Sequence, residues 1–407
     1  MFESIQRVMR ILEICCQTVQ NEVRAQSLLC EVRAMKVAIV AGGVPTNANP
    51  LNGIFEFDQA TALAQSGHDV EYFSIDTHSI RHRRNLRMKE YWRNGVHVFE
   101  GHFPLGRVPK WLTISIGSII IKKQFEKAYG NDGAPDVVHG HFAIPALQAS
   151  KICREMKIPL VYTEHCSLVL KGDADYLRLL AKVSEEAATT IAVSGTLAST
   201  MNDMLGIEST TVYNMVDDIY FNIHREAKTN CKPFRFVSVG SLIPSKGQGS
   251  LIRAFAGMKH SDCVLSIVGD GPLREELINV ARSCGVADRV FFAGQLGREG
   301  VAAEMACSDC FVLSSQRETF GVVYAEALAS GLPVIATRCG GPEDFITSEC
   351  GILVDVGDED ALSSAMDAMF DETISSKRLR KMAESEFSSS AIASQLSSIY
   401  QKAVSHG

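Results

Sequence analysis

The chain has 407 residues, of which 46% are hydrophobic, and carries a formal net charge of −7 with a pI of about 5.9. This length exceeds what one ordinary hydrophobic core occupies and predicts two domains. The acidic balance argues against nucleic-acid binding as the main role. The longest apolar run, at 111–121, is too short to cross a membrane as a helix, although attachment to a membrane surface stays open.

Residues 1–34 carry apolar side chains at helical spacing, which predicts one amphipathic helix or two. The strand pattern of a first domain begins only after this segment, near 36–41. Residues 1–34 are therefore either a helical extension or the product of a start codon assigned too early, and we prefer the second interpretation. The apolar positions are Ile5, Val8, Met9, Leu12, Cys16, Val19 and Val23.

From Met35 onward, short apolar segments alternate with helix-length segments, which is typical of parallel sheets covered by helices on both faces. A polar stretch at 222–233 interrupts the pattern, and we place the domain boundary there. We expect Rossmann-like domains at 35–222 and 223–385, and a helix at 386–407 that could pack back on the first domain. The expected strands lie near 36–41, 70–75, 96–99, 136–140, 160–163, 190–193, 210–213, 235–240, 263–268, 289–293, 309–313 and 333–336.

The segment 81–127 is strongly basic, with eleven Lys or Arg against three Glu. Trp92 and Trp111 lie among these charges, as does Tyr91. Such a mixture suits an anionic membrane surface or a lipid-diphosphate ligand. The alternative is an ordinary solvated face with two tryptophans in the core.

Twelve cysteines are scattered without a disulfide framework, and no apolar signal segment opens the chain. This usage predicts a reducing, cytoplasmic location. Cys307 and Cys310 form a C-x-x-C, but no second pair or histidine cluster accompanies them. We interpret this pair as packing at a helix-to-strand junction, in preference to a zinc or redox site.

Glu318 and Glu326 stand eight positions apart across a loop that runs into a helix, and Gly331 and Pro333 end that helix. Phe320, Gly321 and Val322 would expose the unpaired amides of the first helical turn, where a phosphate is favoured. One carboxylate could then face a sugar and the other a ribose. Taken alone, both could equally be solvated helix charges.

Glycine-containing turns follow two strands of the second half. Gly240 to Gly247 follows the first strand and contains Ser241 and Lys246, whose ammonium could neutralise a diphosphate. Gly269-Asp270-Gly271 follows the next strand, although Asp270 could serve only a tight turn. Residues 339–343 could line the same edge of the sheet.

Taken in order, these motifs closely resemble the family 4 retaining glycosyltransferases, which have the two-domain GT-B fold. The resemblance covers the chain from about Met35 to the C-terminus. Each short motif is weak, and the ordered set is specific. The matching segments are the first strand with its loop up to Gly53-Ile54-Phe55, 67–70, 136–141, Thr163-Glu164-His165, 192–194, 212–217, 240–247, 269–272 and 318–326.

The resemblance implies a role for each matching residue. Glu318 matches the carboxylate beside the donor sugar, and Lys246 the lysine that holds the diphosphate as it leaves. His165 matches a histidine of the first domain close to the donor sugar, although it could instead be a core histidine bonded to backbone. Implied donor contacts come from Glu326, Phe320, Gly321, Val322, Gly240, Ser241, Gly269 and Gly271, with Gly53 in the acceptor or phosphate loop.

One departure concerns Ser241, where family members often have Arg. Either Arg298 or Arg317 supplies the missing charge, or the leaving group is less stabilised. The resemblance implies a nucleotide-diphosphate sugar as donor, no cofactor and no bound metal, and no D-x-D metal-binding signature is apparent in a suitable loop. The sugar would be transferred with retention to a saccharide or lipid-linked saccharide in polysaccharide synthesis.

Four other functions share this fold or part of its pattern. A nucleotide-sugar epimerase and a phosphorylase are alternatives within the enzymes, and a non-catalytic partner in polysaccharide assembly is an alternative outside them. The intact Glu318, Glu326 and Lys246 weigh against the last. A dinucleotide-dependent dehydrogenase is disfavoured because Gly269-Asp270-Gly271 does not continue to G-x-G-x-x-G.

Overall fold

The computed structural model describes residues 34–46, 49–77, 87–105, 108–130, 133–223, 233–370, 372 and 374–406. The predicted helix or helices at 1–34 therefore lie outside the described residues, apart from Ala34. The chain divides into the units Met1–Met35 and Lys36–Gly407, and only the second is described below.

The first sheet has eight strands in the order β3-β4-β2-β1-β5-β6-β7-β8, parallel except at the β3–β4 pair. The strands β1, β2 and β5 are almost wholly buried, and β1 accordingly has a continuous apolar run from Val37 to Ala41. The strands are β1 (Lys36–Ala41), β2 (Asp69–Asp76), β3 (Arg87–Arg93), β4 (Val96–His102), β5 (Val137–His141), β6 (Leu160–Glu164), β7 (Thr189–Ala192) and β8 (Thr210–Thr211).

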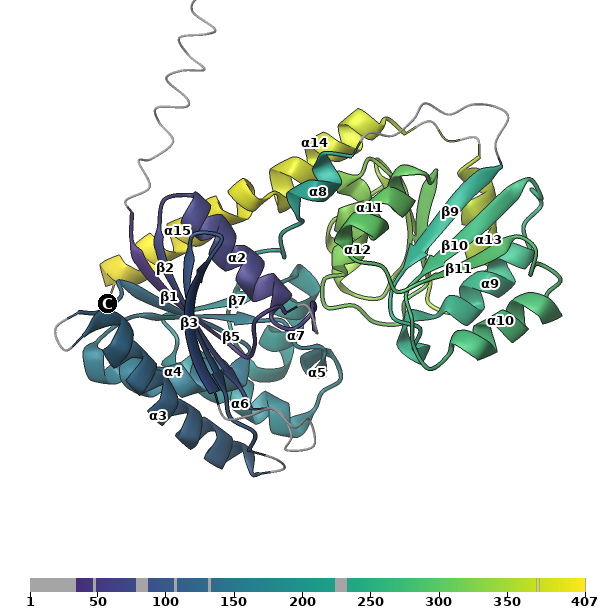
Figure 1. Cartoon of the computed structure of the whole chain (residues 1–407). Coiled ribbons are helices and arrows are strands. Elements are labelled where there is room, and N and C mark those ends of the chain that lie inside the picture. Colours follow the sequence, from purple (N-terminus) through teal and green to yellow (C-terminus); the bar gives the residue numbers. More distant parts are fainter. Residues whose placement is uncertain are drawn as a thin grey trace, which may run out of the picture. The chain divides into compact units, whose positions relative to one another are not determined.

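Helices cover both faces of this sheet. α3 packs on α4 and α4 on α6, whereas α2 packs on α15 (Figure 1). Each crossover helix returns the chain to the start of the next parallel strand, so loops that follow the strands share one edge. The helices are α2 (Ile54–Gln65), α3 (Lys110–Tyr129), α4 (Ala143–Met156), α5 (Ser167–Leu170), α6 (Ala174–Glu186), α7 (Gly195–Leu205) and α8 (Asp218–Phe221).

The second sheet has six parallel strands in the order β11-β10-β9-β12-β13-β14. Its strands are β9 (Phe234–Val239), β10 (Cys263–Val268), β11 (Val290–Gly294), β12 (Cys310–Leu313), β13 (Val334–Thr337) and β14 (Gly351–Val354). Its helical elements are η2 (Pro244–Lys246), α9 (Gln248–Ala256), α10 (Arg274–Ser283), α11 (Arg298–Ala306), α12 (Val322–Ala329), η3 (Gly341–Asp344) and α13 (Glu359–Ala368). Two parallel sheets of this kind confirm the GT-B architecture.

Two strands were not predicted from the sequence. β3 pairs antiparallel with β4 through a two-residue turn at Asn94 and Gly95, both of which have positive φ (51° and 79°). Asn-Gly is the preferred pair for such a turn, so the signal was present in the sequence. β14 is short and only partly buried, which leaves little hydrophobic pattern to detect.

The chain ends in α14 (Ser376–Phe387) and α15 (Ser389–His406). α15 returns to the first sheet, where it contacts α2, β5 and β6. Its Tyr400 hydroxyl lies 2.7 Å from Nδ1 of His139, and its Ser397 hydroxyl 2.7 Å from Nε2 of His68. Buried polar contacts therefore join this helix to the first sheet in addition to apolar packing.

Candidate active site

The structure brings Lys246 and Glu318 into direct contact. The ammonium of Lys246 lies 2.6 Å from Oε1 of Glu318, and the hydroxyl of Ser315 donates to the same oxygen at 2.6 Å. Lys246 ends η2 after β9, whereas Glu318 lies in the loop between β12 and α12. Glu318 is buried, with 9% of its surface exposed, so its charge is satisfied locally. The two residues form an ion pair at the edge where parallel strands end.

Glycines allow the backbone loops at this edge to approach one another closely. A Cβ on Gly269, whose φ is +137°, would lie 2.0 Å from the carbonyl oxygen of Gly240. A Cβ on Gly271 would lie 2.5 Å from the carbonyl oxygen of Leu242, and one on Gly247 would meet that of Ser314 at 2.0 Å. Any side chain at these positions would push apart the loops that carry Lys246.

The helix α12 begins after Gly321, which is left-handed with φ 85°. Val322 therefore starts a helical turn whose first amides have no partner within the helix. The ring of Phe320 is buried and packs against Tyr213, Phe345 and Phe387, so this side chain anchors the loop while its backbone stays at the helix start. The loop is held rigidly enough to present amides to an anion.

Glu326 lies one turn inside α12, beside Arg298 and Tyr220. Burial raises the pKa of Glu326 to about 7, although the charge of Arg298 and the hydroxyl of Tyr220 both lower it. Near neutral pH this carboxyl is therefore divided between its protonated and ionised forms. Either form can hydrogen-bond to hydroxyl groups.

The missing basic partner at Ser241 has two candidate replacements. Ser241 is exposed. Arg298 is already committed, because its guanidinium pairs with Asp58 and lies 2.7 Å from Asp217. Arg317 is exposed and forms no ion pair with another residue of the described ranges. Of the two arginines, Arg317 is the one free to meet a diphosphate.

His165 follows β6 in the first sheet, and its ring bonds to another histidine, not to backbone. Its Nε2 lies 3.0 Å from Nδ1 of His141, at the end of the neighbouring β5. Burial lowers the pKa of His165 to about 4, so the ring is neutral at physiological pH. The alternative of a core histidine bonded to backbone does not describe its ring contacts.

Glu164 fixes the backbone beside His165. In the sequence it was only a member of the Thr163-Glu164-His165 motif, with no predicted role. Its fully buried carboxylate accepts from the backbone N–H groups of His165 (2.8 Å) and Cys166 (2.6 Å). It also accepts from the hydroxyls of Tyr162 and Tyr176. Burial raises the pKa of Glu164 to about 7 against these donors, which lower it.

The loop after β1 folds tightly onto itself at Gly53. Gly53 has φ 71° and precedes α2, and a Cβ there would lie 2.3 Å from the carbonyl oxygen of Gly43. The hydroxyl of Tyr72 donates to the same Gly43 oxygen at 2.8 Å. This loop is thus fixed at the carboxyl edge of the first sheet.

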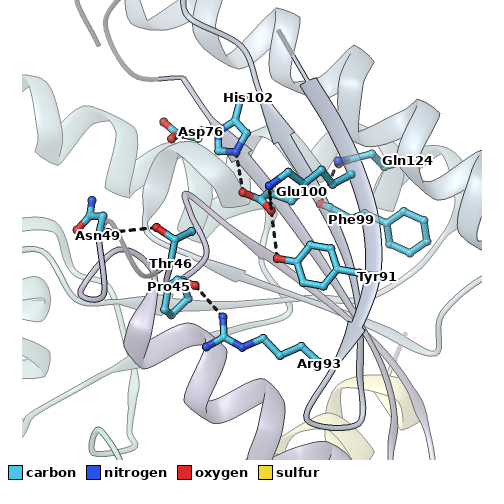
Figure 2. Close-up of polar contacts among 11 residues, drawn as sticks. Pro45, Thr46, Asn49, Asp76, Tyr91, Arg93, Phe99, Glu100, His102 and Gln124 are labelled. Carbon is cyan, nitrogen blue, oxygen red and sulfur yellow. Dashed lines mark hydrogen bonds and ion pairs between the residues drawn. The ribbon is translucent and has the colours of Figure 1, made fainter. Parts of the chain in front are cut away.

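A cluster of charged side chains at the ends of β2 and β4 was missed from the sequence (Figure 2). His102 lies 2.6 Å from Glu100 and 3.3 Å from Asp76, and both carboxylates are buried. Tyr91 donates to Glu100 at 3.1 Å, while Arg93 donates to the carbonyl of Pro45 at 2.7 Å. Tyr91 joins β3 to β4, and Arg93 joins β3 to the loop after β1. Because β3 was not predicted, the sequence did not indicate these two contacts.

The described residues also bear on the C-x-x-C pair, on metal binding and on membrane-spanning helices. Cys307 is the C-cap residue directly after α11 and the buried Cys310 begins β12, as expected for a helix-to-strand junction. Over the same ranges, no three His, Cys, Asp or Glu side chains are grouped to hold a metal ion. None of the described helices combines the length and hydropathy needed to cross a bilayer.

Two family models match almost the whole of Lys36–Gly407. Residues 57–219 match glycosyltransferase family 4, and residues 220–386 match the glycosyl transferases group 1. The N-acetyl-alpha-D-glucosaminyl L-malate synthase of Bacillus anthracis is 30% identical over 284 residues, which cover 65% of this chain and 74% of that protein. The chain belongs to glycosyltransferase family 4. It is a glycosyltransferase of the GT-B fold.

Solved structures of other glycosyltransferases share this fold. Sucrose-phosphate synthase from Thermosynechococcus elongatus has a TM-score of 0.72 at 20% identity and covers 92% of this family 4 chain and 100% of its own. Anabaena HepE in complex with UDP-glucose has a TM-score of 0.67 at 18% identity, with coverage of 90% and 100%. At these identities the likeness establishes the fold alone.

Proposed function

We propose that this enzyme is a retaining, metal-independent hexosyltransferase that uses a nucleotide-diphosphate sugar. The acceptor would be a hydroxyl group of a saccharide or lipid-linked saccharide in cell-surface polysaccharide synthesis. The contact between Lys246 and Glu318 carries the proposal, because it places a cation and a carboxylate together beside the open start of α12. The complex of Anabaena HepE with UDP-glucose supports a nucleotide-sugar donor.

The proposed reaction begins with the donor diphosphate at the amides of α12 and beside Lys246. The bond between the sugar C1 and the phosphate oxygen breaks, and the electron pair leaves with the diphosphate, whose charge Lys246 offsets. The acceptor hydroxyl then forms its bond to C1 on the same face. Its proton passes to the departing phosphate oxygen. In this proposal Glu318 faces the cationic sugar, and Glu326 binds the ribose hydroxyls.

We place the acceptor at the carboxyl edge of the first sheet. The β1 loop at Gly53 and the cluster of Asp76, Glu100 and His102 lie at this edge. His102 keeps 16% of its side chain exposed, whereas the carboxylates behind it are almost covered. His102 is thus the group of the cluster that an acceptor can reach.

Two alternative functions predict different outcomes. A nucleotide-sugar epimerase would convert the donor without an acceptor, and a non-catalytic scaffold would bind without turnover. The test is a thermal-shift panel of UDP-, GDP- and ADP-sugars with the full chain, followed by product analysis with candidate acceptors. Ligand binding raises the melting temperature in proportion to ln(1 + [L]/Kd).

The proposal expects one nucleotide to stabilise the chain and an α-linked donor to give an α-linked product by NMR. A β-linked product would refute retention. Loss of activity with EDTA, restored by a divalent ion, would refute metal independence. An isomerised donor in the absence of acceptor would favour the epimerase, and binding of a donor without any turnover would favour the scaffold.

We also propose cytoplasmic action with peripheral contact to an anionic membrane through the basic segment 81–127. Residues 81–86 and 106–107 lie outside the described residues. Elsewhere in the segment, Trp92 and Trp111 are 65% and 66% exposed, so the interpretation of two core tryptophans is wrong. Ile119, 59% exposed, shares α3 with Trp111 and the exposed Lys122.

The α3 surface combines apolar and cationic groups, which favours an anionic interface. A hollow of about 330 Å³ beside it is lined by four basic side chains, three of which pair with Glu155 or Glu186. The basic side chains are Lys122, Lys151, Arg154 and Lys182. We expect the full chain to sediment with phosphatidylglycerol vesicles at low salt, and Trp111→Ser to weaken this several-fold.

The matched control is Phe291→Ser, which removes an exposed aromatic ring from β11 of the second sheet. This variant should sediment like the parent. Equal binding to neutral phosphatidylcholine vesicles, or no binding to either, would rule out the anionic contact.

A further inference from the structure

Three histidine rings form a row beneath the carboxyl edge of the first sheet. His139 and His141 alternate along β5 and so point to the same face, and His165 follows the neighbouring β6. The ring centroids are 4.2 Å apart from His139 to His141 and 5.3 Å apart from His141 to His165. All three residues are buried. The row connects the interior of the sheet to the candidate catalytic histidine.

The inner end of the row is held at both ring nitrogens. Nδ1 of His139 lies 2.7 Å from the hydroxyl of Tyr400 on α15, and its Nε2 lies 2.7 Å from the hydroxyl of Thr163 on β6. With both nitrogens bonded, the His139 ring cannot turn without losing a buried hydrogen bond. His139 therefore forms a fixed wall against which the His141 ring packs.

The outer two rings share one hydrogen bond, between Nδ1 of His141 and Nε2 of His165 at 3.0 Å. The remaining nitrogens, Nε2 of His141 and Nδ1 of His165, are buried and have no hydrogen-bond partner. Burial lowers the pKa of both residues, so each ring is neutral and carries one proton. One ring must donate to the other.

Asn214 distinguishes the two possible directions. Its Oδ1 is also buried without an aligned partner, and the side chain lies near enough to His165 to favour a proton there. An amide oxygen can only accept, so it matches a proton on Nδ1 of His165. In the opposite direction His141 would bury an N–H with no acceptor, which costs free energy.

We propose that His141 is a positioning residue: it donates its Nδ1–H to Nε2 of His165 and fixes His165 as the Nδ1-protonated tautomer. His165 then presents an N–H donor at Nδ1 and is prevented from acting as a base through Nε2. Asn214 lies beside this N–H without an aligned hydrogen bond, and a donor-sugar oxygen would accept it instead. That last step rests on the proposed function, whereas the tautomer does not.

The tautomer can be read directly by NMR of the full chain labelled with ¹⁵N-histidine. Long-range ¹H–¹⁵N correlations distinguish a protonated from a bare ring nitrogen, and single His141→Asn and His165→Asn variants identify the two signals. We expect a protonated Nδ1 and a bare Nε2 on both rings. A proton on Nε2 of His165 would overturn the proposal, whether or not the chain transfers sugar.

Two variants at His141 separate positioning from packing. His141→Asn keeps an amide donor near the place of Nδ1, whereas His141→Leu fills the space without a donor. We expect the Asn variant to retain the His165 tautomer and most of the activity. The Leu variant should show both tautomers and lose about tenfold in kcat with little change in donor KM, the size of one hydrogen bond.

Equal activity of the two variants would overturn the positioning role. If His141→Leu fails to fold, the tautomers in the parent and in His141→Asn still decide the matter. If no transfer is detected even in the parent, the proposed function fails while the NMR result stands independently.

Discussion

Replacement of Lys246 by alanine is expected to lower kcat/KM for the donor by about a hundred- to a thousandfold. This is the usual loss when one preorganised group that stabilises a developing negative charge is removed. Where Arg317 does not contact the diphosphate, the loss should be near the upper end, because Ser241 supplies no second charge and Arg298 is held by Asp58 and Asp217. Steady-state kinetics with saturating acceptor, once the donor is identified, give the comparison.

Glu318→Gln is expected to cost a similar factor, mostly in kcat, because the amide keeps the shape and loses the charge. The variant breaks a partly exposed ion pair, so its stability should change by only ~1 kcal/mol. Glu359→Gln is the matched control: it breaks the 2.7 Å pair with Arg253, in the same domain, between the helices α9 and α13. The control should keep full activity.

Either of two results would contradict these roles. If Lys246→Ala and Glu318→Gln turned over as fast as the Glu359→Gln control, the ion pair would be structural only. If Arg317→Ala lost as much activity as Lys246→Ala, the missing charge at Ser241 would be supplied by Arg317, and the diphosphate would be held by two cations.

Most of the fold was readable from the sequence because buried parallel strands have a strong hydrophobic signal. Every predicted strand from 36–41 to 333–336 has a counterpart in the structure within a few residues. The exception in the first sheet, β3, is an edge strand rich in charges, and its only signal was the Asn94-Gly95 pair.

The site divides into parts that are local in sequence and parts that are not. Glu318 and Gly321 lie within one short motif, so their proximity could be predicted. The roles of His141 and Glu164 could not be predicted, because His141 meets His165 across neighbouring strands and Tyr176 reaches Glu164 from α6. The bond from His141 to His165 depends on the pairing of His141 with Thr163 in the sheet, and a one-residue change in register would turn the ring to the other face.

Glu164→Ala is expected to destabilise the first domain by ~3 kcal/mol or more. The substitution leaves the hydroxyls of Tyr162 and Tyr176 and the N–H groups of His165 and Cys166 without their buried acceptor. Each unpaired buried donor costs about 1–3 kcal/mol, less whatever relaxation and entering water recover. Tyr176→Phe, which removes a single donor, should cost only ~1 kcal/mol.

The measurement is urea unfolding followed by tryptophan fluorescence. Both tryptophans of the chain, Trp92 and Trp111, lie in the first domain, so the signal reports that domain alone. The sign of the pH dependence follows from the pKa of Glu164, which rises from 4.5 to about 7 on folding. Folding takes up a proton between these values, so the parent loses stability as the pH rises through that window. The deficit of Glu164→Ala should therefore be larger at pH 5 than at pH 8, and a deficit that grew with pH would show that the buried carboxylate folds in its ionised form.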